Sequence, residues 1–187
     1  AKSLKMLGVE HNTKVQALGG GKNHMIVLPD ADLDMAADAA VSASFGAAGQ
    51  RCMAVSVAVP VTEAVADALV QRLVPKIKEL KIGPATDTSS EMGPLVTAQH
   101  LEKVAGYIDA GESEGADVVV DGRNFKQDKQ GYENGFFIGG TLLDNVKENM
   151  SCYQEEIFGP VLSVVRKNSY QEALDLIHSH EYANGTA

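Results

Sequence analysis

The sequence predicts an α/β fold with an open, largely parallel, twisted sheet flanked by helices. Two features of the 187 residues support this prediction. Short apolar runs rich in valine and isoleucine alternate with longer segments in which apolar residues recur at helical spacing. Such alternation favours a largely parallel sheet over an all-β or all-α fold. A chain of this length is one domain by default and can bury a sizeable core.

The first strand and helix are expected near the start of the chain. Residues 25–28 form a short apolar run that Pro29 stops, which is typical of a buried strand. Asp30 or Asp32 can cap a helix over residues 33–45, because an aspartate side chain accepts hydrogen bonds from the first free N–H groups of a helix. This segment therefore begins the alternation.

A second pair of elements follows directly. The valine-rich residues 55–61 predict a strand, and Thr62 can cap the helix behind it. We expect Pro75 to kink or shorten this helix, because proline lacks the N–H group that a helix interior needs. Apolar residues recur along this helix at helical spacing and form one face; they are Val65, Leu69, Leu73 and Ile77.

The second half continues with a loop and a third helix. Residues 83–94 are rich in Gly, Pro, Ser and Thr, and Thr97 can cap a helix that the glycines of residues 111–115 end. Residues 118–120 then predict a strand, and residues 121–135 an exposed polar connection. The apolar positions of the helix are Leu101, Val104 and Ile108.

Two strands and one helix complete the predicted domain. Residues 136–143 and 161–165 predict the strands, and residues 170–179 the helix. Position 1 is alanine, and residues 182–187 stop at an asparagine-glycine turn that should lead into more structure. We therefore expect a domain that has been cut at both ends.

Composition and charge exclude several classes of function. A net charge of −9 and scattered basic residues argue against a nucleic-acid partner, and aromatic residues, at 5% with no tryptophan, supply few stacking platforms. No apolar run reaches the roughly 20 residues of a membrane helix, and no signal peptide opens the chain. Two cysteines cannot form a secreted disulfide framework and indicate a reducing compartment. We expect a protein without a nucleic-acid or membrane partner.

The segment Gly49-Gln50-Arg51-Cys52 places a cysteine where the alanine-rich helix runs out into a glycine turn. A cysteine acts as a nucleophile only as the thiolate, which nearby cations, backbone N–H groups and partial exposure favour. The opposing interpretation is a buried cysteine that packs as a small hydrophobic residue. The tetrapeptide alone leaves both open.

Four other candidates have simpler interpretations. His24, beside an apolar run, is expected to be a hydrogen-bonded core or edge residue rather than the base of a Cys-His pair. His178 and His180 lack the further ligands that zinc needs, so we expect no metal. Cys152 is expected to pack rather than to act as a second thiol. Lys103 is expected on a solvated helix face.

Three segments carry a family resemblance when they are taken together in this order and spacing. They are Leu-Gly-Gly-Gly-Lys-Asn at residues 18–23, Gly-Ala-Ala-Gly-Gln-Arg-Cys at residues 46–52 and Glu-Glu-Ile-Phe-Gly-Pro at residues 155–160. The triple glycine alone matches no phosphate-binding pattern and indicates a tight turn with close backbone approach. Jointly, the segments closely resemble the catalytic domain of the aldehyde dehydrogenase superfamily, over nearly the whole chain.

Within the superfamily, the sequence resembles one branch in particular, the CoA-acylating methylmalonate-semialdehyde dehydrogenases, whose nucleophile motif is Gly-Gln-Arg-Cys. It implies that Cys52 attacks the aldehyde, that hydride passes to NAD, and that a thioacyl enzyme remains. It implies that the backbone N–H of Cys52 donates to the oxyanion. It also implies that Glu156 binds a cofactor ribose, that Phe158 packs beside the nicotinamide, and that Arg51 contacts the substrate carboxylate.

One departure from the hydrolytic relatives bears on the product. Those relatives carry Glu-Leu-Gly-Gly-Lys, whose glutamate activates the deacylating water; counted back from Lys22, the corresponding residue here is Leu18. Water needs a base, whereas a thiol is partly ionised at neutral pH. Coenzyme A is therefore the expected acyl acceptor, giving an acyl-CoA. The family resemblance further implies loss of CO2 from the acyl group. The alternatives are a hydrolytic semialdehyde dehydrogenase with a displaced base and an isolated domain without activity.

The resemblance also implies properties of a longer parent protein. The NAD-binding domain and the strand used in subunit pairing are expected outside residues 1–187, so that this piece would be inactive alone. The parent is expected to be a homo-oligomer, a dimer or tetramer, that takes a small-molecule semialdehyde in valine catabolism. Its expected location is the cytoplasm in bacteria or the mitochondrial matrix in eukaryotes.

Overall fold

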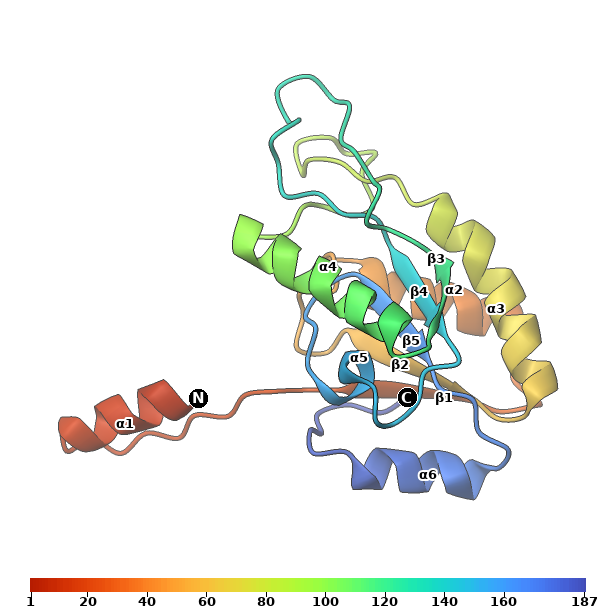
Figure 1. The fold of residues 1–187 in the computed structure, drawn as a ribbon, viewed down its shortest axis with the longest axis horizontal. Coiled ribbons are helices and arrows are strands. Elements are labelled where there is room, and N and C mark those ends of the chain that lie inside the picture. Colours follow the sequence, from red (N-terminus) through yellow and green to blue (C-terminus); the bar gives the residue numbers. More distant parts are fainter.

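The computed structural model describes all residues from Ala1 to Ala187 and contains one five-stranded sheet in the order β1-β2-β5-β4-β3 (Figure 1). Neighbouring strands are parallel except β3, which runs antiparallel to β4. The predicted α/β class with a largely parallel sheet is confirmed. The strands are β1 (Asn23–Val27), β2 (Val55–Pro60), β3 (Asp117–Val120), β4 (Thr141–Asp144) and β5 (Val161–Val164).

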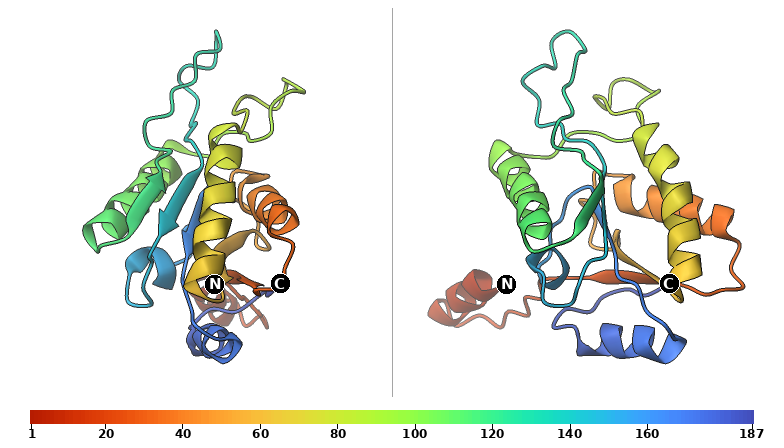
Figure 2. Two further views of the ribbon diagram at one scale, coloured as in Figure 1. Left: turned by 90° about the vertical axis from the view of Figure 1, so that its right-hand side faces the viewer. Right: turned by 45° about the vertical axis from the view of Figure 1, so that its right-hand side comes forward.

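Helices cover both faces of the sheet. In Figure 2, α2 and α3 lie on one side of the strands and α4 on the other, with the short α5 beside it; α6 lies below the sheet and α1 projects away from it (Figures 1 and 2). The helices are α1 (Lys2–Glu10), α2 (Leu33–Phe45), α3 (Glu63–Lys78), α4 (Ala98–Ser113), α5 (Ser151–Gln154) and α6 (Tyr170–Ser179).

The predicted caps start the helices where the sequence places them. The Asp32 side chain accepts hydrogen bonds from the backbone N–H groups of the first turn of α2. Thr62 and Thr97 accept from the first turns of α3 and α4. Each bond satisfies an N–H group that has no partner within the helix. Asp32 rather than Asp30 is therefore the cap of α2.

The structure corrects two of the expected elements. The strand expected over residues 136–143 is wrong in its first half, because β4 begins only at Thr141. The Gly139 N–H donates to the Gly122 carbonyl, and the two glycine backbones approach so closely that this segment crosses another part of the chain instead of joining the ladder. Pro75 does not end α3, which continues to Lys78. Helices α1 and α5 were not predicted.

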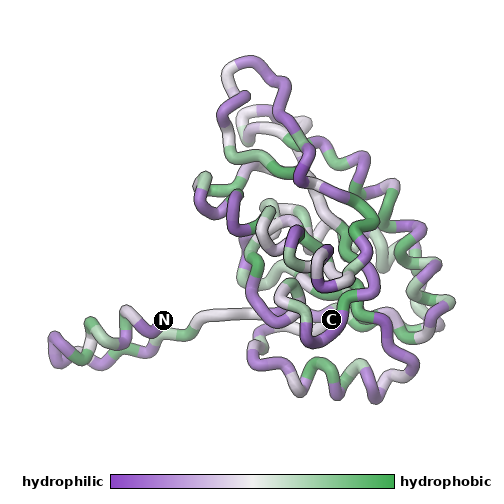
Figure 3. The backbone as a smooth tube through the Cα atoms, viewed as in Figure 1, coloured by the Kyte–Doolittle hydropathy of each residue, from purple (hydrophilic) through white to green (hydrophobic).

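The core lies between the sheet and the helices that cover it, in one cluster of 35 buried residues. Apolar residues gather on the central elements, whereas the connection over residues 121–135 is largely hydrophilic and lies away from the sheet, as predicted (Figure 3). None of the helices has the length and apolar character needed to cross a membrane. At the opposite end of the molecule, residues 182–187 run beside β1. There the Ala187 N–H donates to the His24 carbonyl, and the Ala187 carbonyl accepts from the Ile26 N–H.

Candidate active site

The three sequence segments singled out above meet around one small cavity of about 20 Å³. All four predicted site residues, Arg51, Cys52, Glu156 and Phe158, line it. Gly21, Lys22 and Asn23 from the glycine turn line it as well. A space of this size holds about one water molecule. The structure therefore brings together residues that lie more than a hundred positions apart.

The direction in which the strands run explains why these segments meet. Each segment stands immediately before a strand: the glycine turn before β1, the cysteine turn before β2 and the glutamate segment before β5. These three strands are parallel neighbours, so their amino-terminal ends share one edge. Ligand sites in open α/β sheets ordinarily lie at the carboxyl-terminal ends of the strands. This site is built at the opposite edge.

Cys52 lies in the tight turn between α2 and β2, and its thiol is exposed. Exposure removes the interpretation of Cys52 as a packed core residue. Its backbone N–H donates to no group in the chain. That N–H is therefore free to donate to an oxygen atom bound beside the sulfur.

The turn is held against the glutamate segment by a close backbone approach. Gly49 has φ +67°, and a Cβ atom at this position would overlap the carbonyl group of Gly159 and lie 3.1 Å from the nitrogen of Pro160. Ala48 beside it also has a positive φ, of 52°. Only glycine fits at position 49, because this conformation and this contact both exclude a side chain.

Phe158 is fixed from its backbone while its ring stays 39% exposed. Its φ of 58° is rare for an aromatic residue. The Nε2 of His100, at the start of α4, donates to the Phe158 carbonyl at 2.6 Å, and the two rings meet edge to face at 6.4 Å. Behind the ring, Gly159 packs against Val104 of α4. Helix α4 therefore orients Phe158 at the mouth of the cavity.

Lys22 connects the glycine turn to the glutamate segment. Its side chain is buried, and its Nζ donates to the carbonyl oxygens of Cys152 at 2.8 Å and Glu155 at 2.7 Å. Burial lowers the pKa of Lys22 to about 8, against the partial opposition of neighbouring acidic groups. These bonds satisfy carbonyls at the end of α5, next to Glu156.

The glycines in front of Lys22 form a tight turn with close backbone approach, as the sequence indicates. Gly20 has φ +88°, and a Cβ atom there would lie 2.5 Å from the ring of Tyr182. A Cβ atom on Gly21 would lie 3.6 Å from Oε1 of Glu156. The turn therefore places backbone rather than side chains against the Glu156 carboxylate, which takes part in no ion pair within the chain.

Three more predicted positions are now placed. The Arg51 side chain is exposed, and its guanidinium binds no carboxylate of the chain. Leu18 is 86% exposed and does not line the cavity. Lys103 lies on the exposed face of α4 with its Nζ 5.5 Å from the Tyr107 ring, which agrees with a solvated helix face.

His24 is a core residue, as predicted. It lies within β1, buried, and its two ring nitrogens contact the Lys22 carbonyl and the Tyr153 hydroxyl, both at 3.1 Å. Burial lowers the pKa of His24 to about 4, so the ring is neutral at neutral pH. Cys152 is likewise buried, and burial raises the pKa of its thiol. Cys152 packs in the core cluster, in agreement with the prediction.

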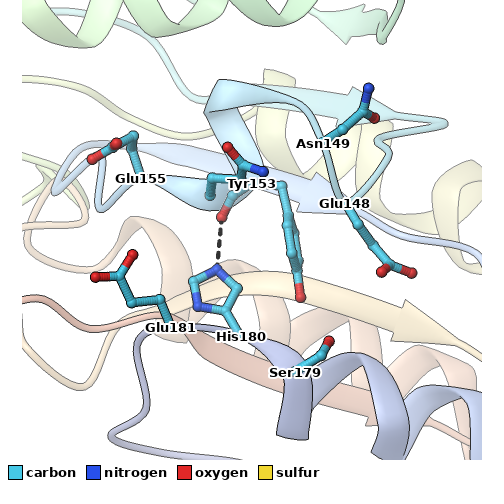
Figure 4. Close-up of a pocket in the computed structure, with 8 residues that line it drawn as sticks. Glu148, Asn149, Tyr153, Glu155, Ser179, His180 and Glu181 are labelled. Atoms are coloured by element: carbon cyan, nitrogen blue, oxygen red, sulfur yellow. Dashed lines mark hydrogen bonds between the residues drawn. The ribbon is translucent and has the colours of Figure 1, made fainter.

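A larger groove of about 530 Å³ lies apart from this cavity, between α5 and the end of α6 (Figure 4). His180 points across it, with Nε2 3.0 Å from the Tyr153 carbonyl, and its Nδ1 accepts from the Tyr182 N–H at 2.9 Å. Both ring nitrogens are therefore engaged within the chain. No group of three or more His, Cys, Asp or Glu side chains is arranged to hold a metal ion.

Sequence reasoning missed three residues that hold the site together. Asn23 and Asn184 both donate from their side-chain amides to the Cys52 carbonyl. His100 holds the Phe158 carbonyl. Asn23 stands inside a segment that the sequence singles out, but only the fold shows that its side chain turns toward the cysteine turn.

Comparison with known proteins gives matches over almost the whole chain. The sequence model described as "Aldehyde dehydrogenase family" matches residues 3–187. A malonate-semialdehyde dehydrogenase of Pseudomonas aeruginosa is 57% identical over 179 residues, which are 96% of this chain and 36% of that protein. A mitochondrial methylmalonate-semialdehyde/malonate-semialdehyde dehydrogenase (acylating) of Homo sapiens is 46% identical over 180 residues, which are 96% of this chain and 33% of that protein.

A solved structure matches equally well. A Sinorhizobium meliloti protein assigned as a methylmalonate-semialdehyde dehydrogenase, in complex with NAD, superposes with a TM-score of 0.94 at 52% identity. The match covers 100% of this chain and 38% of that one. The chain thus spans about a third of the length of the curated relatives that it matches.

Proposed function

Because this chain belongs to the aldehyde dehydrogenase family, we propose that it is the catalytic-cysteine part of a longer NAD-dependent enzyme that oxidises malonate or methylmalonate semialdehyde. The observation that carries the proposal is the single cavity shared by Cys52, Arg51, Glu156 and Phe158. The relatives named above supply the substrate class, and the structure supplies a thiol, a free cation and a free carboxylate in one place.

Cys52 is the proposed nucleophile. Its thiolate attacks the aldehyde carbon, a carbon–sulfur bond forms, and the carbonyl oxygen takes up the electron pair. The free N–H of Cys52 donates to that oxygen, which stabilises the developing negative charge. Loss of a hydride from the same carbon then leaves a thioester on Cys52. Arg51, exposed and unpaired at the position before Cys52, lines the same cavity and binds the carboxylate at the other end of the semialdehyde acid.

The residues at the cavity suit one end of the cofactor. The unpaired carboxylate of Glu156 can accept hydrogen bonds from two hydroxyl groups of a ribose. The exposed ring of Phe158 offers an apolar face to a flat heterocycle. When bound, NAD supplies the acceptor for the hydride that leaves the substrate carbon. The cavity itself is too small for the cofactor, which must lie over these residues and against another part of the longer protein.

Coenzyme A is the proposed acyl acceptor. Leu18, in the position where hydrolytic relatives carry a glutamate, has no carboxylate and points to solvent outside the cavity. Water needs a base to attack a thioester, whereas the thiol of coenzyme A is already partly ionised at neutral pH. The product is an acyl-CoA. The β-carboxylate of the acyl group leaves as CO2, the electron pair of the broken carbon–carbon bond passes to the thioester as an enolate, and a proton from water then takes the place of the carboxylate on carbon. No metal is required for any of these steps.

One observation favours a second candidate, hydrolysis to the free acid. Glu156 is a carboxylate in the same cavity as Cys52 and could serve as a displaced base for water. The acylating reaction remains the preferred proposal, because the Glu156 carboxylate is then available to the ribose. The two candidates differ in the need for coenzyme A.

Mass spectrometry of the longer parent protein tests the proposal. After incubation with semialdehyde and NAD, the Cys52 peptide should carry an acyl adduct that disappears only when coenzyme A is added, with acyl-CoA as the product. Rapid formation of free acid without coenzyme A would refute the acylating reaction, and its loss in Glu156→Gln would assign the base. Turnover retained in Cys52→Ser would refute the nucleophile. The 187-residue chain alone should show no NAD reduction.

The relatives include a bacterial protein and a mitochondrial one. We therefore propose the cytoplasm for a bacterial parent and the mitochondrial matrix for a eukaryotic one, and a homo-oligomeric parent in either case. Fractionation and size-exclusion chromatography with light scattering would test these two points.

A further inference from the structure

The carbonyl oxygen of Cys52 receives two side-chain amides from distant parts of the chain. The Nδ2 of Asn23, at the start of β1, donates to it at 2.8 Å. The Nδ2 of Asn184, near the end of the chain, donates to the same oxygen. A carbonyl oxygen has two lone pairs, so these two donors satisfy its full capacity. The peptide group that follows the cysteine is therefore held from two sides.

Asn23 is committed to this turn by all of its polar atoms. Its side chain is buried, and its Nδ2 donates a second hydrogen bond to the Ala54 carbonyl at 2.6 Å. Its Oδ1 accepts from the Gly185 N–H at 2.8 Å. The amide has only one orientation that fits, because a flipped group would set its oxygen against two carbonyls and its N–H groups against an N–H. Asn23 thus connects the cysteine turn to the end of the chain.

Asn184 reaches the same carbonyl from a strained and exposed position. Its φ is 141°, a conformation that residues other than glycine rarely adopt. The side chain is exposed, so burial does not hold it there, and its amide also contacts the Met53 sulfur at 3.3 Å. Residues held in rare backbone conformations cluster at functional sites. Ala48 and Phe158 are two further non-glycine residues with positive φ. Ala48 lies in the turn that carries Cys52, and Phe158 lines the cavity.

We propose that Asn23 and Asn184 are positioning residues that form a two-amide clamp on the Cys52 carbonyl and so fix the direction of the sulfur and of the free Cys52 N–H toward the bound aldehyde. The clamp rests on the proposed role of Cys52 as the nucleophile. It acts on kcat rather than on cofactor binding, because neither asparagine side chain donates to Glu156 or Phe158. Removal of either amide lets the turn that carries the nucleophile move.

Asn184 gives the sharper test, because its side chain is exposed. In the longer parent protein, Asn184→Ala should lower kcat by about 10-fold with an unchanged KM for NAD, since a displaced reacting group loses rate steeply with distance. Asn184→Gly should behave alike, because glycine keeps the backbone conformation and lacks only the amide. The rate of iodoacetamide alkylation of Cys52, followed on the Cys52 peptide, should change in both variants. Melting temperatures should stay close to that of the wild type.

Asn145 provides a matched control, because it also has a positive φ and a side-chain amide that donates a hydrogen bond. Asn145 has φ 54° and donates from its side chain to Asp117 at 2.6 Å, on the far strands of the sheet. Asn145→Ala removes a comparable bond and should leave kcat and the alkylation of Cys52 unchanged. Equal losses of kcat in Asn145→Ala and Asn184→Ala would overturn the clamp, since they would show a general effect on folding.

Asn23→Asp tests the buried half of the clamp with a side chain of the same shape. The carboxylate oxygen that replaces Nδ2 would face the carbonyl oxygens of Cys52 and Ala54, so kcat should fall by about 100-fold, the loss expected when a reacting group shifts by about 1 Å. When Asn184→Ala is added to Asn23→Asp, kcat should fall by less than a further 10-fold, because both changes act on the same carbonyl. Wild-type kcat and alkylation rates in these variants would refute the proposal. The alkylation readout tests the clamp even if Cys52→Ser retains turnover and the proposed function itself fails.

Discussion

The contact between Gly49 and Gly159 yields a prediction about both stability and activity. Gly49→Ala places a methyl group where the Gly159 carbonyl already lies, and Cβ atoms in real structures essentially never come closer than 3.0 Å to such an atom. Neither partner is a flexible side chain, so one of the two backbones must shift by about 1 Å, a displacement that costs about 100-fold in rate when it moves a reacting group. Cys52 is three residues away in the same turn.

The stability cost can be estimated from the same geometry. A non-glycine residue at φ +67° is itself strained, and a strained backbone residue costs about 1–3 kcal/mol. With the overlap added, Gly49→Ala should lower the free energy of unfolding by about 2–3 kcal/mol, which is about 5–10 °C in melting temperature for a chain of this size. Thermal denaturation followed by circular dichroism measures the shift, and iodoacetamide alkylation of Cys52 measures the displacement of the turn.

Gly106→Ala is the matched control. Gly106 lies in α4, and a Cβ atom there would meet nothing within 4 Å. Alanine is the better helix former by about 1 kcal/mol, so this variant should be slightly more stable and should leave Cys52 unaffected. A Gly49→Ala protein that melts within about 2 °C of the wild type and reacts at the same rate would refute the reasoning, since that would be less than 1 kcal/mol.

Three further predictions concern groups around the site and the sheet. Burial lowers the pKa of Lys22 to about 8, so between pH 8 and 10.5 the unfolded chain binds more protons at this residue than the folded chain does. Lys22 should therefore add about 3 kcal/mol to the free energy of unfolding over that range, and urea titrations should show the wild type gaining about that much relative to Lys22→Met. Arg166→Met removes the partner that donates to Asp144 at 2.6 Å and 3.1 Å, and the buried carboxylate left behind should cost about 3–5 kcal/mol in urea unfolding; a loss below 1 kcal/mol would contradict this. His100→Ala removes the hydrogen bond to the Phe158 carbonyl and should raise the KM for NAD of the parent protein by about 5-fold, whereas an unchanged KM would show that α4 does not orient the ring.

Elements with strong local signals could be predicted from the sequence. Helix α2 lies where Asp32 and the apolar pattern place it, and α6 begins and ends at the predicted residues. Local signals sufficed because a cap and a periodic apolar face act within a few residues of one another. The α5 turn has only four residues, too few for a periodic pattern, and therefore escaped prediction.

The same distinction between local signals and long-range contacts applies to the candidate site. Cys52 and Glu156 could be proposed as site residues from the sequence, because the motifs that contain them resemble those of a known family. Their meeting at the amino-terminal ends of three strands depends on the order β1-β2-β5, which only long-range pairing decides. The roles of Asn23 and His100 depend on where a side chain points after folding, and no spacing in the sequence encodes that direction.

The edge of the sheet on which the candidate site lies decides which end of a helix is near Cys52. A helix that joins two parallel strands runs back against them, so the helix end nearest to Cys52 is the carboxyl-terminal end of α2, at Phe45. The dipole of a helix places partial negative charge at that end, so α2 offers no positive end to an anion bound at the cysteine turn. Many reactive cysteines draw on the opposite end of a helix. The positive groups that this site offers to an anion are instead the free Cys52 N–H and the unpaired Arg51 side chain, so they come from the turn itself rather than from a helix.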